Sequence, residues 1–424
     1  MNIHPFLLNE SECLSQLQQD ALAVFGHAVQ SANPYDSTCK ALQKETNRQF
    51  RFVLSIGKAA VPMMQAAYDT FGADGIQEAV LVTKYEHLGS FSAPNCVCFE
   101  AGHPVSDENS RKAAEYVLAG TGSLCETDVC LVLISGGGSA LFESSLIDAR
   151  QQQQITERLL KSGADIYELN CVRKRLSAVK GGKLAAHMQP ATVRTYALSD
   201  VPGSRPDVIA SGPTQQDPVS DETLRGIVKK YDLNDSGIFD TLPSKACLPD
   251  HPHFCIVGDV KMLCDAAAEE AEKRGYQTVH CGTDLSGDAE EATVKVLQTA
   301  IACARSKSGK TAFIIGGETT VTVRGNGKGG RSQQAALRAA IELQNTQNIV
   351  FLAGGSDGTD GPTDAAGGLA DGCTVQRMHE RGIDASSALA NNDAYTALRA
   401  GNALLMTGPT GTNVNDLILI LIQA

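Results

Sequence analysis

Residues 312–331 read AFIIGGETTVTVRGNGKGGR and contain an apolar run, a series of glycines and a closing arginine. We expect a strand over 312–315 and a helix over about 332–343, so the glycines would link a strand to a helix. Glycine lets backbone N–H groups approach a ligand closely, and the start of a helix carries partial positive charge. Because Arg331 can hold a planar set of oxygens, the stretch predicts an anion site suited to phosphate.

The composition of the 424 residues is that of a globular protein, with 42% hydrophobic and 20% charged residues. The net charge of −12 argues against nonspecific binding to nucleic acid or to an anionic membrane. The 13 cysteines include no C-x-x-C pair, and no apolar run reaches membrane-spanning length. These features predict a cytoplasmic protein with reduced thiols.

Short β-rich runs alternate with helical patterns along the chain, which predicts an α/β fold of parallel sheets covered by helices. The expected strands are 52–56, 79–82, 97–99, 129–134, 192–198, 254–257, 278–281, 312–315, 348–352 and 403–406. Asn, Asp, Ser, Pro and Gly cluster over 232–252, so we expect one domain at 1–240 and another at 250–424.

Glycines follow several of these strands, as in Gly57, Gly136–Gly138, Gly316–Gly317 and Gly354–Gly355. In open α/β sheets, ligands bind at the carboxyl ends of the strands. Turn chemistry explains any one of these loops. Their combination with nearby hydroxyl and charged side chains indicates a site for a polyanion.

Two glycine motifs suggest other nucleotide sites. Residues 308–311 (SGKT) end like a Walker A loop, but they precede a strand and so have the wrong order. Gly325-x-Gly327-x-x-Gly330 matches the dinucleotide fingerprint, although no acidic residue has the required spacing. NAD binding therefore stays open as an alternative.

Charged residues next to the loops are the other candidates. Lys58 opens a helix, where a cation is unfavourable unless an anion binds, and this favours a functional role. The basic segment 173–183 is expected to be a solvated helix face, with Asn170 and Arg173 projecting together. Acidic residues in the loops are either turn formers or groups that hold Mg²⁺ or accept a proton. His103 is expected to be structural.

Nine composite motifs, in order over about residues 50–420, resemble the class II glycerate kinases. They are SIGKAA (55–60), GHP (102–104), SGGGSA (135–140), NCVRKRLSAVKGGK (170–183), LSDV (198–201), IASGPT (209–214), GGETTVTVRGNGKGGR (316–331), SDGTDGPTDAAGG (356–368) and TGPTGTNVND (407–416). The last three look like the MOFRL region of that family, at about 310–420.

The resemblance implies phosphorylation of D-glycerate at the 2-hydroxyl by ATP with Mg²⁺, giving 2-phosphoglycerate and ADP. It also implies a larger Rossmann-like N-terminal domain, a smaller mixed α/β C-terminal domain and an active site in the cleft between them. Carried over by motif, the catalytic residues are Lys58, Arg331, Asp200 and Asp357, of which either aspartate could hold the metal or act as the base. The nucleotide phosphates would contact Gly57, Ser135, Gly136, Gly137, Gly138, Ser139, Gly329 and Gly330. The substrate would contact Asn170, Arg173, Glu318 and Asp360.

The chain departs from the family pattern at Ser204 and Gln334, where the family carries carboxylates, which leaves the hydroxy acid less certain. One alternative function is an NAD(P)H-dependent hydroxypyruvate reductase that uses the glycines at 325–330. Another is a nonenzymatic sensor of a phosphorylated metabolite. The sequence does not determine the oligomeric state, and a homodimer is an open alternative.

Overall fold

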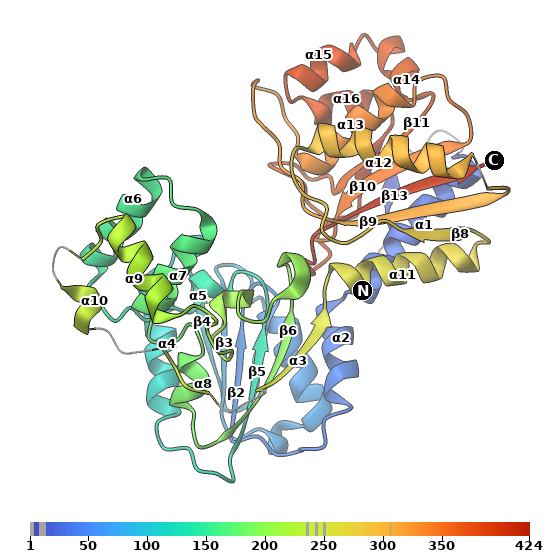
Figure 1. Ribbon diagram of the computed structural model, residues 1–424. Coiled ribbons are helices and arrows are strands. Elements are labelled where there is room, and N and C mark those ends of the chain that lie inside the picture. The colour runs from blue at the N-terminus through green and yellow to red at the C-terminus, as the bar shows by residue number, and fades with distance from the viewer. Residues whose placement is uncertain (1–3, 8–13, 235–236, 242–244, 249–251, 306) are drawn as a thin grey trace. The chain divides into compact units, whose positions relative to one another are not determined.

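The computed structural model describes residues 4–7, 14–234, 237–241, 245–248, 252–305 and 307–424 (Figure 1). The chain forms two compact units. We call Pro34–Ser199 with Ser204–Val257 the N-terminal unit. We call Met1–Asn33, Asp200–Gly203 and Gly258–Ala424 together the C-terminal unit.

The sheet of the N-terminal unit has the order β4-β3-β2-β5-β6-β7. Its strands are β2 (Phe52–Ile56), β3 (Ala79–Lys84), β4 (Cys96–Ala101), β5 (Val129–Ile134), β6 (Thr192–Leu198) and β7 (His253–Gly258). The pairs from β4 to β6 are parallel. Numbered within the unit, the order is 3-2-1-4-5-6, which is the Rossmann arrangement. The expected α/β fold with a Rossmann-like domain is confirmed.

Buried apolar strands explain why helices surround this sheet. Every residue of β2 is buried, as is typical of a parallel strand covered on both faces. The helices of the unit are α2 (Pro34–Leu42), α3 (Ala60–Phe71), α4 (Glu108–Gly120), α5 (Gly138–Leu141), α6 (Ala149–Lys161), α7 (Ile166–Leu176), α8 (Lys183–His187), α9 (Asp221–Lys230) and α10 (Ile238–Thr241). The helices α6, α7 and α9 share a small core of their own around Leu159, Val172 and Leu224.

The sheet of the C-terminal unit has the order β1-β12-β11-β10-β13-β9-β8. Its strands are β1 (Phe6–Leu7), β8 (Gln277–His280), β9 (Lys310–Gly317), β10 (Ile349–Gly355), β11 (Gly367–Asp371), β12 (Leu404–Met406) and β13 (Asp416–Gln423). Only the pair β8 and β9 is parallel among those the structure describes. Our expectation of parallel sheets is therefore wrong for this unit. The last strand, β13, runs antiparallel between β9 and β10, and the pairs β10 with β11, β11 with β12 and β12 with β1 are antiparallel as well.

Helices cover both faces of this sheet. Ile418, Ile420 and Ile422 of β13 share a core with α12 (Ala289–Ala304) and α13 (Arg331–Glu342). On the other face, α1 (Gln16–Ser31) lies against α11 (Val260–Lys273), as the blue and yellow helices of Figure 1 show. The remaining helices, α14 (Thr374–Glu380), α15 (Ala385–Ala390) and α16 (Ala394–Ala400), pack beside α13. None of the described helices is long and apolar enough to cross a membrane.

The two units differ from the expected domains at both ends of the N-terminal unit. We expected residues 1–240 to form one domain, but α1 packs in the C-terminal unit. The strand expected at 254–257 was to open the second domain, yet it lies in β7, the edge strand of the N-terminal sheet. Alternating helix and strand patterns do not say to which sheet an element belongs, so the sequence could not reveal either exchange.

A buried carboxylate attaches α1 to its unit. Asp20 is 3% exposed and accepts a hydrogen bond of 2.8 Å from the Tyr276 hydroxyl. Arg274 donates to it over 3.2 Å, and the Lys310 ammonium lies 3.5 Å away. Asp20 therefore holds α1 against the segment that follows α11 and against the start of β9.

We expect Asp20→Ala to lower the free energy of unfolding by about 2 kcal/mol, because a buried, multiply bonded charge is lost. Denaturant unfolding followed by circular dichroism measures the change. Glu269→Ala is the matched control, since Glu269 forms an exposed i,i+4 pair with Lys273 on the neighbouring α11. Equal midpoints for the two variants would contradict the anchoring role of Asp20.

Candidate active site

Two loops meet at the point where the strand order of the N-terminal sheet reverses. Ile56 of β2 is paired with Ile134 of β5, and each strand then ends in a glycine loop. Gly57 has a φ of +123°, and a Cβ at that position would lie 2.1 Å from the Ser135 hydroxyl oxygen. The Lys58 N–H donates to the Gly136 carbonyl over 2.9 Å. The glycine therefore allows the two loops to touch at the crevice where sheets of this type bind ligands.

Ser135 joins these loops through its side chain. Its hydroxyl accepts a hydrogen bond of 3.0 Å from the Ala59 N–H and donates to the Ile56 carbonyl over 3.3 Å. The residue is 1% exposed. These bonds give the Ser135 side chain a positioning role, and its contact with phosphate stays a prediction.

The same loops offer unpaired donors. In the part of the chain that the structure describes, the N–H groups of Gly136 and Gly137 donate to no protein acceptor. Lys58 likewise has no carboxylate partner among the described residues, and its side chain is half-buried. Two N–H groups without an acceptor, close to the Lys58 side chain, are the kind of group that binds an anion.

Ser139 and Arg173 extend this group. The Arg173 guanidinium lies 3.4 Å from the Ser139 hydroxyl, which is 2.8 Å from the hydroxyl of Ser211. Asn170 is one turn before Arg173 on α7, as expected. The backbone at Ala210 and Ser211 is left-handed, with φ of +49° and +63°. Such a conformation is costly in residues other than glycine and is concentrated at functional sites.

The basic segment that follows is not a solvated face, which corrects our expectation. Lys174 is 6% exposed and pairs with Asp207 and Asp217 over 3.6 and 3.3 Å. Lys180 is fully buried and pairs with Glu143. The Lys183 ammonium donates to three backbone carbonyls at the end of α7. These contacts give all three lysines partners within the protein.

Arg331, the first residue of α13, is held by two carboxylates of the C-terminal unit. Its guanidinium forms a bidentate pair with Asp416 over 2.6 and 3.0 Å and donates to Glu318 over 2.6 Å. Although burial opposes the charged form, the bond to Asp416 raises the pKa of Arg331. Three of its five N–H donors are engaged, and two stay available among the described contacts. Arg331 is therefore a fixed, partly exposed cation.

Asp416 is the residue that our sequence analysis missed. It is paired in register with Gly317 on one side and with Gly355 on the other, because β13 is antiparallel to both neighbours. The amino end of β13 thus lies at the carboxyl ends of β9 and β10. The available signal was its place as the last residue of TGPTGTNVND, directly before six apolar residues.

Asp357 lies in the turn after β10. A Cβ at Gly355 would be 3.1 Å from a carboxylate oxygen of Asp357 and 3.5 Å from one of Asp416. Asp357 accepts one hydrogen bond of 3.1 Å, from the Thr359 N–H, which leaves further lone pairs for a proton or a cation. Asp200 follows β6 and is half-buried.

Asp360 occupies the start of α13, where we had predicted phosphate. Its carboxylate accepts hydrogen bonds from the N–H groups of Ser332 and Gln333 over 3.2 and 2.7 Å. A Cβ at Gly330 would lie 2.3 Å from it, so the glycine is needed for this close approach. The structure therefore shows Asp360 as a cap of α13, while its predicted contact with the substrate and the predicted contacts of Gly329 and Gly330 with phosphate stay predictions.

The dinucleotide fingerprint is explained in the same way. A Cβ at Gly325 would lie 2.3 Å from Asn391, and one at Gly327 would lie 2.4 Å from Asp393. These glycines pack against the turn before α16, and Asp360 fills the helix start that a pyrophosphate would need. The geometry offers no support for a dinucleotide at this loop.

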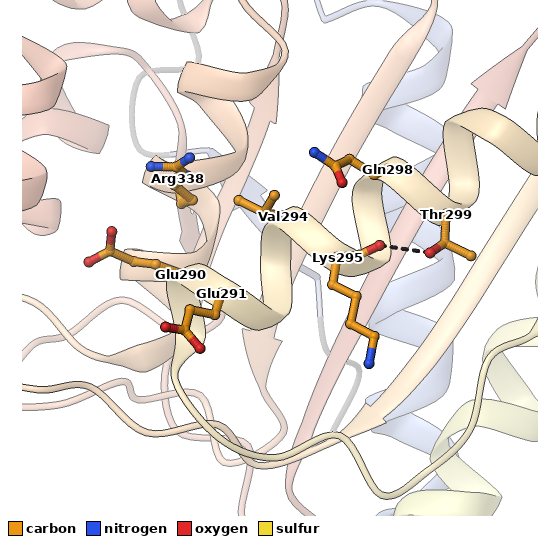
Figure 2. Close-up of a pocket in the computed structure, with 7 residues that line it drawn as sticks. All are labelled: Glu290, Glu291, Val294, Lys295, Gln298, Thr299 and Arg338. Atoms are coloured by element: carbon orange, nitrogen blue, oxygen red, sulfur yellow. Dashed lines mark hydrogen bonds between the residues drawn. The ribbon is translucent and has the colours of Figure 1, made fainter.

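A hollow along α12 has no residue that we predicted to be catalytic. Its volume is about 490 Å³, and Figure 2 shows Glu290, Glu291, Lys295 and Arg338 around it. Across the described ranges, no group of three or more His, Cys, Asp or Glu side chains has the arrangement of a metal site.

Comparison with known proteins decides the family. The D-glycerate 2-kinase of Thermotoga maritima is 40% identical over 417 residues, covering 96% of this chain and 98% of its own. The glycerate 2-kinase of Pyrococcus horikoshii is 35% identical, with the same coverage of both chains. The chain belongs to the class II glycerate kinases.

Structure and domain content agree with this membership. The crystal structure of the glycerate kinase from Thermotoga maritima superposes with a TM-score of 0.90, covering 96% of this chain and 99% of that one. Residues 20–241 match a domain of unknown function, and residues 311–416 match the MOFRL family. A protein of Agrobacterium vitis that is provisionally named hydroxypyruvate reductase is also 37% identical, over 94% of this chain and 93% of its own.

The buried cap should give the protein a pH-dependent stability. Burial raises the pKa of Asp360 to about 6, above its usual 3.8. Between these values the folded state holds a proton that the unfolded chain releases, so the contribution of Asp360 to the free energy of unfolding should fall as the pH rises from about 4 to about 6. Urea unfolding across this range should show a flatter dependence in Asp360→Asn. Asp364→Asn, an exposed control on the same loop, should keep the decline, and an unchanged slope in Asp360→Asn would contradict the assignment.

Proposed function

We propose that the protein transfers the γ-phosphoryl group of ATP to the 2-hydroxyl of D-glycerate. The observation that supports this most is the uncompensated Lys58 beside two unpaired N–H groups, at the reversal point of a Rossmann-type sheet. Phosphoryl transfer depends on positioning and charge neutralisation, which is what such a site offers. The free thiols of the described cysteines support a cytoplasmic location.

The two units contribute different chemistry to this proposal. The N-terminal unit presents cations and N–H donors, which suit the phosphates of the nucleotide. The C-terminal unit presents carboxylates around one fixed cation, Arg331. We assign Lys58, Gly136, Gly137 and Ser139 to the phosphates. Asn170 and Arg173 suit the carboxylate of the substrate.

In the reaction, the C2 hydroxyl oxygen bonds to the γ-phosphorus while the bond from that phosphorus to the bridging oxygen breaks. ADP leaves with the electron pair. The carboxylate of Asp357 or Asp200 accepts the hydroxyl proton. Lys58 and Arg331 stabilise the charge that develops on the phosphoryl oxygens.

Mg²⁺ neutralises phosphate charge when it is bound. This cation usually takes one or two protein carboxylates together with the phosphates of a nucleotide. The open lone pairs of Asp357 fit that pattern, and Asp200 is the other candidate.

A reductase is the second candidate function, because of the provisionally named relative. The packing of Gly325, Gly327 and Gly330 against protein groups argues against a dinucleotide there. Coupled assays separate the two functions. We expect ADP release that requires both D-glycerate and Mg²⁺, with no oxidation of NADH or NADPH by hydroxypyruvate. Cofactor oxidation without ADP release would establish the reductase instead.

Loss of either catalytic cation should reduce kcat/KM by about 10³-fold or more, since each stabilises the transition state. The variants are Lys58→Ala and Arg331→Ala, assayed by ADP release. Arg331→Ala leaves Asp416 buried without its partner, so Arg331→Lys is the variant that keeps the charge but loses the bidentate geometry. We expect it to be impaired as well.

Lys295→Ala, on the exposed face of α12, is the control and should keep full activity. Circular dichroism confirms that each variant is folded. Wild-type turnover in both Lys58→Ala and Arg331→Lys would overturn the assignment of these residues, whatever the substrate.

A further inference from the structure

A row of basic side chains follows the carboxyl edge of the N-terminal sheet. Ile56 of β2 is paired with Val82 of β3, and Lys58 and Lys84 each lie two residues further along. Lys84 is in turn paired with Ala101 of β4, and His103 lies two residues beyond that partner. Because parallel strands in register end at the same edge, the sheet places these three basic residues along one rim.

His103 reaches from its edge strand to the central glycine loop. A Cβ at Gly137 would lie 3.1 Å from Cδ2 and 3.3 Å from Nε2 of the His103 ring, and 3.2 Å from Cγ of Lys58. The imidazole and the lysine side chain therefore enclose the bare α-carbon of Gly137. The Nε2 edge of the ring faces the loop whose N–H groups are unpaired.

Among the described residues of the unit, no acidic side chain forms an ion pair with the lysines of this rim. Lys84, like Lys58, has no ion-pair partner among the described residues. Of the nearby acids, Glu100 accepts the Leu88 N–H, and Asp107 is engaged by Ser110 and the Tyr85 hydroxyl. Glu86 is exposed to solvent. Burial, followed by the charge of Lys58, lowers the pKa of His103, as expected beside unpaired cations.

We infer that Lys84 and His103 are further phosphate-binding residues, which extend the Lys58 site along the rim to hold the polyphosphate of the nucleotide. This inference rests on the proposed function for the identity of the ligand. Lys84 supplies a second ammonium group, and His103 supplies an imidazole N–H donor. The chain has a net charge of −12, yet these basic groups have no acidic partner in the part of the chain that the structure describes, and an anion of several charges would supply one.

The test compares two probes by isothermal titration calorimetry: ADP, which carries phosphates, and adenosine, which does not. For Lys84→Met and His103→Gln, we expect ADP to bind about ten- to a hundredfold more weakly, the usual effect of losing a hydrogen bond to a charged group. Adenosine should bind as it does to the wild type. In turnover, KM for ATP should rise while kcat stays close to that of the wild type.

Two further variants complete the design. Lys84→Arg keeps the charge and should retain most of the affinity for ADP. Lys112→Met removes an exposed lysine from α4, away from the rim, and should change neither probe. An unchanged ADP affinity in Lys84→Met and His103→Gln would overturn the inference. So would an equal loss of ADP and adenosine binding, because that result indicates a general structural effect.

The failure of this inference can be told from the failure of the proposed function. If the wild type binds ADP but phosphorylates no D-glycerate, the proposed function fails while the binding data still decide the roles of Lys84 and His103. If D-glycerate is phosphorylated and both variants bind ADP normally, only the inference fails.

Discussion

The bidentate ion pair between Arg331 and Asp416 fixes the geometry of the C-terminal unit's candidate site. It joins the start of α13 to the start of β13, and the register of β13 places Asp416 between the ends of β9 and β10. Because Asp416 is almost fully buried, the pair is costly to break and holds the guanidinium in one orientation. Such fixed placement suits the role that we propose for Arg331, the stabilisation of a transferring phosphoryl group.

The candidate site residues of the two units carry opposite charge. In the N-terminal unit, Gly57 lets two strand ends touch, and the resulting loops present Lys58 and two N–H groups that have no acceptor among the described residues. In the C-terminal unit, Asp360 accepts hydrogen bonds from the N–H groups at the start of α13, and Asp416 forms an ion pair with Arg331. In our proposal the N-terminal unit therefore binds the phosphates, and the glycine-rich stretch 316–331 contributes Arg331.

The local parts of the fold could be predicted from the sequence, whereas the long-range pairings could not. Strands such as β2 and β5 follow from apolar runs bounded by glycine. The insertion of β13 between β9 and β10 depends on tertiary pairing, so Asp416 escaped notice although its motif was visible. Burial of charged side chains also depends on long-range contacts. Lys174 and Lys180 have the sequence pattern of a solvated helix face, but their buried carboxylate partners lie over thirty positions away in sequence.

The central claim is phosphorylation of the 2-hydroxyl, and ³¹P NMR of the product formed from D-glycerate and ATP tests it most directly. Phosphate on C2 couples to a single carbon-bound proton and should give a doublet, whereas phosphate on C3 couples to two protons and gives a triplet. The account predicts the doublet of 2-phosphoglycerate, together with ADP in equal amount. A triplet, or no new phosphomonoester from the wild-type protein, would contradict it.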